Sequence, residues 1–82
     1  MNHKIETETQ LIKFMFIENQ FVKGKGFFGM IAEIFHQHET AHVRVYNGIK
    51  WISRIKSLST LTPIGMEEFS QRCHKRGITS HP

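Results

Sequence analysis

The sequence predicts a mainly β protein with a helix at each end, and three observations carry this prediction. Three glycines between residues 24 and 29 break the chain repeatedly, which disfavours a long helix there. An Asn47-Gly48 pair lies between two segments of alternating apolar residues, a pattern typical of a β-hairpin. Near the C-terminus a proline is followed by acidic and then basic residues, which indicates a short final helix.

The composition restricts the chain to one small basic domain. Its 82 residues contain 11 Lys and Arg against 7 Asp and Glu, a net charge of +4. A hydrophobic content of 39% excludes a disordered chain, and the single Cys73 excludes an internal disulfide framework. The longest apolar run, Leu11–Ile17, is shorter than the roughly 20 residues of a membrane span, and the acidic Glu6 and Glu8 before it do not fit a signal peptide. We therefore expect a cytoplasmic protein with no membrane partner.

Residues 1–20 are predicted to contain an N-terminal helix over about residues 8–19. Thr7 is followed three residues later by Gln10, which is a capping-box spacing, and apolar residues continue through Ile17. A strand buried on both faces would show the same run of apolar residues. Either element must dock on the rest of the domain or on a second copy, so a homodimer is one expectation.

Residues 21–64 are predicted to form the β structure, with one strand over Gly29–Phe35 and a hairpin around Asn47-Gly48. A two-residue type I′ turn would place Tyr46 opposite Ile49, Arg44 opposite Trp51, and Val43 opposite Ile52. Because side chains alternate along a strand, two faces follow. One face carries Val43, Val45 and Ile52 with Lys50 near the tip, and the other carries His42, Arg44, Tyr46, Ile49 and Trp51.

Residues 65–77 are predicted to contain the C-terminal helix, over about residues 65–76, with residues 78–82 as a tail. Thr62 would be the N-cap and Pro63 the first helical residue. Glutamates at 67 and 68 precede basic residues at 72, 75 and 76, an order that complements the helix dipole, and Gly77 can end the helix.

Several features of residues 21–64 match one family layout. These are Val22-Lys23-Gly24-Lys25-Gly26 before a strand, the strand Gly29–Ile34, the Asn47-Gly48 hairpin, and the spaced Trp51-Ile52, Ile55, Leu58 and Leu61. The segment resembles the SH3-like small barrels of the KOW and Tudor type, and the resemblance implies a five-stranded barrel that binds nucleic acid, peptides or other proteins. The plasmid-borne dihydrofolate reductases are similar in layout. Their Val-Gln-Ile-Tyr run is replaced here by Ile49-Lys50-Trp51-Ile52, which argues against a reductase.

The hairpin region supplies a candidate binding surface. No acidic residue lies between Glu39 and Glu67, although four basic residues do. Cations suit backbone phosphates and aromatic rings suit unstacked bases, so we predict nucleic-acid or partner binding here. In an alternative interpretation the aromatic residues are core residues and the basic ones a solvated rim, and a peptide groove would use the same aromatics. The candidate residues are Arg44, Tyr46, Lys50, Trp51, Arg54 and Lys56.

One string matches a catalytic motif. His38-Glu39-Thr40-Ala41-His42 fits the zincin pattern, in which two histidines on one helical face hold Zn²⁺ and the glutamate activates a water; Glu67 or Glu68 could then be a third ligand. The predicted hairpin begins directly after His42, so such a helix would have to stop there. A non-catalytic metal site from His36, His38 and His42 is a further alternative. We expect a polar loop over residues 36–40 instead, and no cofactor.

Together these observations predict a small non-enzymatic binding module that acts on nucleic acid or on a nucleic-acid-handling protein. A small, basic, cysteine-poor chain would suit an accessory or regulatory protein of a phage or mobile element. One alternative is a protein-binding or inhibitor module that acts on a host protein. A second is a minimal zinc hydrolase that uses the string at residues 38–42.

Overall fold

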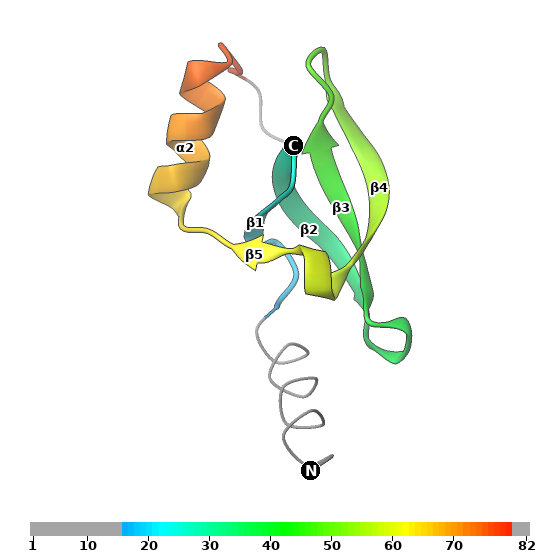
Figure 1. Ribbon diagram of the computed structural model, residues 1–82. Coiled ribbons are helices and arrows are strands. Elements are labelled where there is room, and N and C mark those ends of the chain that lie inside the picture. The colour runs from blue at the N-terminus through cyan, green and yellow to red at the C-terminus, as the bar shows by residue number, and fades with distance from the viewer. Residues whose placement is uncertain (1–15, 80–82) are drawn as a thin grey trace.

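The computed structural model describes residues 16–79, and its centre is a five-stranded antiparallel sheet with one α-helix beside it (Figure 1). The prediction of a mainly β chain with a C-terminal helix is confirmed. The strands are β1 (Phe21–Gly24), β2 (Phe27–Phe35), β3 (Thr40–Tyr46), β4 (Trp51–Ser57) and β5 (Thr62–Pro63). Short 3-10 turns, η1 (His36–His38) and η2 (Leu58–Thr60), and the helix α2 (Met66–Lys75) complete the elements.

The sheet is open, with the strand order β4-β3-β2-β1-β5. Within residues 16–79, β4 pairs with β3 alone and β5 pairs with β1 alone, so these two strands form the edges. The expected five strands are therefore present, but they do not close into a barrel. One edge is very short, whereas β4 offers a long edge.

The β3–β4 hairpin differs from its predicted register by two residues. Tyr46 pairs with Trp51, and Arg44 pairs with Ser53. The loop spans residues 47–50, because the Asn47 amide donates to the Lys50 carbonyl at 3.0 Å. Asn47 does not adopt the positive φ that a type I′ turn requires, and its side-chain oxygen instead accepts the Ile49 and Lys50 amides at 2.8 and 2.9 Å. A shift of two residues preserves the two predicted faces, because side chains alternate with a period of two.

The main core lies on one face of the sheet, which we call the inner face. β-branched side chains at alternate strand positions are fully buried there, and η2 adds Leu58 from the connection between β4 and β5. Val43 and Val45, which alternation placed on one face of the hairpin with Ile52, are buried in this core, and Ile52 packs against it. Its buried residues are Phe16, Val22, Ile31, Ala41, Val43, Val45, Leu58 and Leu61.

The predicted N-terminal helix over residues 8–19 lies mostly outside the described residues. Its predicted end at residue 19 is wrong, because the chain turns between Ile17 and Gln20. Asn19 has a φ of 68°, and the Gln20 amide donates to the Ile17 carbonyl at 3.3 Å. The Asn19 amide also bonds the Ile31 carbonyl at 2.8 Å, so the turn is held against β2. Asparagine tolerates this left-handed conformation, which interrupts a helix.

The helix α2 agrees with the predicted range of about residues 65–76, but its predicted N-cap is wrong. Thr62 and Pro63 pair with β1 as β5, and Gly65 is the N-cap of α2. Pro63 is compatible with this role because β5 is an edge strand and proline has no amide to donate. The predicted charge order is present, with acidic residues in the first turn and basic residues in the last. Gly77 ends the helix with a φ of 68°, as its position suggested.

Candidate nucleic-acid interface

The helix α2 covers part of the outer face of the sheet through a single buried side chain, Phe69. Its ring stacks on Phe21 with centroids 4.0 Å apart, and lies nearly parallel to Trp51 at 5.9 Å. The ring of Phe28 meets Phe69 edge-on at 5.5 Å. These four residues form a second apolar group, the outer aromatic cluster, on the face opposite the main core.

Trp51 is therefore a structural residue of the outer aromatic cluster as well as a predicted binding residue. It is half-buried, and Phe28 and Tyr46 contact its ring edge-on at 5.9 and 5.4 Å. The Tyr46 hydroxyl donates to the Ile49 carbonyl at 3.1 Å, which ties it to the hairpin loop. The alternative interpretation of these aromatics as packing residues fits Trp51. Base stacking on the hairpin stays a prediction. The basic side chains are the groups of this surface that a ligand can reach directly.

Two of the predicted basic residues, Arg44 and Lys50, lie near the same end of the hairpin. Arg44 is on the outer face and donates to the Ser53 hydroxyl at 3.1 Å, and Lys50 is exposed in the loop. The hairpin loop and the C-terminal end of α2 lie at one end of the molecule (Figure 1). There the Arg76 guanidinium lies 5.0 Å from the centre of the Phe28 ring, and Lys75 is exposed beside it. We name Arg44, Lys50, Lys75 and Arg76 the basic end.

Arg54 and Lys56 do not belong to the basic end. They occupy inner-face positions of β4, opposite Val43 and Ala41. Lys56 Nζ lies 4.4 Å from the centre of the Phe27 ring, and Arg54 donates to the Ser53 carbonyl at 3.0 Å. The structure thus divides the six predicted residues between the two faces of the hairpin. It also adds Lys75 and Arg76, which sequence analysis treated only as helix-dipole residues.

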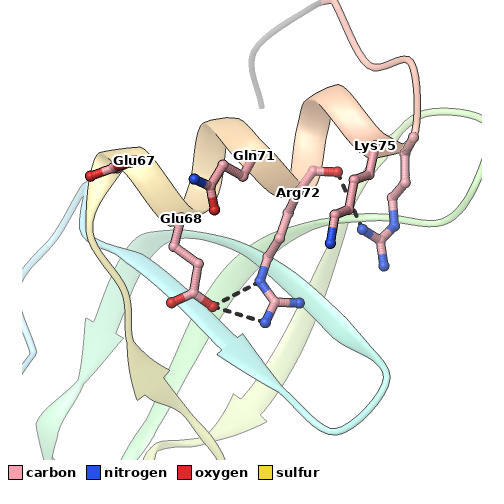
Figure 2. A pocket seen from close by; sticks show the side chains of 6 residues that line it. Glu67, Glu68, Gln71, Arg72 and Lys75 are labelled. Atoms are coloured by element: carbon pink, nitrogen blue, oxygen red, sulfur yellow. Dashed lines mark hydrogen bonds and ion pairs between the residues drawn. The ribbon is translucent and has the colours of Figure 1, made fainter.

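Glu68 makes two ion pairs, one with β1 of the sheet and one within α2. Its carboxylate accepts Lys23 Nζ of β1 at 3.0 Å and the Arg72 guanidinium at 2.8 Å, and Figure 2 shows the Glu68–Arg72 pair. Hydrogen bonds from Lys23 and then Arg72 hold the pKa of Glu68 below its ordinary value. Beside this pair is an open pocket of about 580 Å³. The pocket is lined by Glu67, Glu68, Gln71, Arg72, Lys75 and Arg76.

The string at residues 38–42 lacks the helix that zincin chemistry needs. His38 ends η1, whereas His42 lies within β3 opposite Glu33 and Ile55. Glu39, between them, has a φ of 54° in the left-handed region. The expected polar loop is present as η1 and Glu39, although Thr40 already belongs to β3. Among the described residues, no group of three or more histidine, cysteine or acidic side chains is placed to hold a metal ion.

Comparisons with known proteins place this chain in no family: no family model matches it, and no curated protein or solved structure matches it either. Among residues 16–79, no helix has the length and apolar character needed to cross a membrane.

The Glu68 ion pairs predict a specific pH dependence. Because the folded pKa of Glu68 is lowered, its pairs stabilise the fold above the ordinary glutamate pKa, and this stabilisation is lost as the pH falls through the folded pKa. The urea midpoint of the wild type should exceed that of Glu68→Gln at pH 6, and the difference should shrink as the pH is lowered below the ordinary glutamate pKa. A difference that stays constant across this range would contradict the assignment.

Proposed function

We propose that the protein is a non-enzymatic nucleic-acid-binding module that contacts phosphates with its basic end. The proposal rests on which basic side chains have a carboxylate partner and which do not. Within residues 16–79, the ion pairs all involve Glu68 and use Lys23 and Arg72. None of the four cations of the basic end has a carboxylate partner among these residues. Four cations with no carboxylate partner in the described part of the chain lie at one end of a small domain. Together they form a surface suited to a phosphate backbone.

The proposed contact is mainly electrostatic. Phe69 lies against the Trp51 ring, so the rings of the outer aromatic cluster already pack on one another. Phosphate contacts position a protein on nucleic acid and carry no direct sequence information. We therefore expect similar affinity for different sequences and a steep dependence on salt.

The finer fold assignment is part of the same proposal: the open sheet is a variant of the SH3-like small barrel. Two features support it. One is the antiparallel succession β2–β3–β4 with the short strands β1 and β5 beside it, and the other is the turn η2, which places Leu58 and Leu61 in the core before the last strand. We also propose that such a small basic module acts in the cytoplasm as an accessory protein of a phage or mobile element.

Fluorescence anisotropy with labelled single- and double-stranded oligonucleotides tests the function. If four cations each contact a phosphate, raising the salt from 50 to 200 mM should weaken binding on the order of 100-fold. The double variant Arg44→Ala/Arg76→Ala should bind about tenfold more weakly at low salt and show a shallower salt dependence.

The matched control is Arg54→Ala, which removes one cation from the other face of the hairpin. It should change the affinity by less than about twofold. Absence of binding at 50 mM salt, or an equal loss for the control and the double variant, would refute the proposed surface.

A further inference from the structure

The β4 edge carries backbone groups that point away from the sheet. At one end of the β3–β4 ladder the Asn47 amide bonds the Lys50 carbonyl at 3.0 Å, and at the other the Leu58 amide bonds the Glu39 carbonyl at 2.8 Å. Hydrogen-bonded and non-hydrogen-bonded pairs alternate along an antiparallel ladder. Even-numbered residues of β4 therefore bond β3, and Ser53, Ile55 and Ser57 direct their amides and carbonyls outward.

Two of these outward carbonyls are occupied by nearby side chains. The Arg54 guanidinium donates to the Ser53 carbonyl at 3.0 Å, and the Thr60 hydroxyl donates to the Ser57 carbonyl at 2.7 Å. The Ile55 side chain, between them, is 61% exposed. Among the described residues no strand pairs with this edge. The edge thus combines open backbone groups, an exposed apolar side chain and the flanking cations Arg54 and Lys56.

We propose that the β4 edge binds an extended acidic segment of a protein partner by strand addition. Arg54 and Lys56 lie two residues apart on the inner-face side, so carboxylates at alternate positions of an added strand would lie beside both. An apolar residue between the two acids would lie on the other side and cover Ile55. The recognised pattern is therefore acid, apolar, acid.

Arg54 gives a reason for the acidic requirement. In the free protein its guanidinium donates a hydrogen bond to the Ser53 carbonyl. This bond makes the edge less able to pair with any other strand that approaches it. A partner carboxylate offers a charge-assisted bond, which is stronger than a bond to a neutral carbonyl. When Arg54 turns to that carboxylate, the Ser53 carbonyl becomes free to accept a partner amide.

A second copy of the chain fits this edge less well. Antiparallel pairing of two β4 strands would bring Arg54 and Lys56 of both copies together, and like charges on paired strands are destabilising. The β4 edge shares no residue with the basic end, although Arg44 donates to the Ser53 hydroxyl. The inference therefore does not depend on nucleic-acid binding.

The test uses the full chain and a labelled short peptide in which two glutamates are separated by one valine. We expect binding that shifts the amide resonances of Ser53 and Ile55. The variant Ile55→Pro removes an outward amide and leaves the ladder to β3 intact, because edge strands tolerate proline on the solvent side. The proline variant should weaken peptide binding at least tenfold, which is about the effect of losing one or more hydrogen bonds. The variant Ile55→Ala keeps the amide and should weaken peptide binding about threefold.

A second pair of variants tests the charge requirement if Ile55→Pro does not fold. Arg54→Glu should weaken peptide binding about tenfold. The control Lys25→Glu makes the same change of charge in the β1–β2 turn and should alter peptide binding less than twofold. Replacing both glutamates of the peptide by lysine should abolish binding.

Three results would overturn the inference: no peptide binding at millimolar concentration, equal effects of the proline and alanine variants, or resonance shifts confined to another surface. A dimer in analytical ultracentrifugation that Ile55→Pro dissociates would assign the edge to a second copy instead. Oligonucleotide binding should be unchanged by Ile55→Pro, so this inference and the proposed function can fail separately.

Discussion

Replacing Phe69 with alanine should lower the free energy of unfolding by about 3–5 kcal/mol, the usual cost of removing a buried phenylalanine ring. Phe69 is 3% exposed and is the one buried residue of α2. Its ring packs on Phe21, Phe28 and Trp51, so its loss removes the apolar attachment of the helix to the sheet. The remaining contacts with the sheet are the Glu68–Lys23 ion pair and the Arg76 guanidinium near the Phe28 ring. These contacts are partly exposed and contribute little.

Urea unfolding followed by tryptophan fluorescence measures this effect, because Trp51 is the single tryptophan and contacts Phe69 directly. The matched control is Met66→Ala on the same helix, where the side chain is 71% exposed. It should change the stability by less than about 0.5 kcal/mol. Similar stabilities for the two variants would show that α2 is not held by Phe69.

A methyl group at Gly29 should be at least as damaging. A Cβ atom there would overlap the Arg44 carbonyl oxygen and lie 2.8 Å from its carbonyl carbon and 3.1 Å from Val45 Cα. All three atoms belong to the β3 backbone, so no side-chain rotation can relieve the overlap. Gly29→Ala must push β2 and β3 apart, and we expect a loss of about 3 kcal/mol or more.

Thermal unfolding and the yield of folded protein provide the measurement for Gly29→Ala. Gly65→Ala is the matched control, because a Cβ atom at Gly65 meets no atom within 4 Å and its φ of −81° is ordinary for any residue. Its cost should stay below about 1 kcal/mol, the effect of a poorer N-cap. A folded Gly29→Ala variant with wild-type stability would contradict the close β2–β3 approach.

Local patterns were sufficient for most of the strands and for the C-terminal helix. Alternation of apolar residues placed Val43 and Val45 on the same face of the hairpin, and both are buried there. The predicted loop was too short, but the assignment of strand side chains to the two faces of the hairpin was still correct. A register error of two residues leaves the side-chain direction unchanged. The charge order of α2 was also a local signal, since it depends on the dipole of the helix itself.

The predicted boundaries failed where another bond competed with the structure that the local motif favours. The motif Thr62-Pro63 is a good helix start in isolation, but pairing with Val22 and Lys23 makes it a strand. The pair Asn47-Gly48 favours a two-residue turn, yet the Asn47 side chain binds two loop amides and the longer loop results. The pairing of Thr62-Pro63 with β1 has no signature within a few residues of the motif, whereas the Asn47 bonds are local and reach amides two and three residues away.

The sequence by itself determined that this is a small, basic, mainly β chain with a hairpin near residue 47 and a helix after residue 65, because these features follow from composition and short-range periodicity. Only the tertiary structure decided the composition of the candidate surfaces. Phe69 reaches Trp51 from another element, and the end of α2 that carries Arg76 lies at the same end of the molecule as the hairpin loop with Lys50 (Figure 1). Among residues 16–79, β4 is an edge strand. Each of these depends on which elements pack together, and a linear pattern carries no direct record of contacts between residues far apart in the chain.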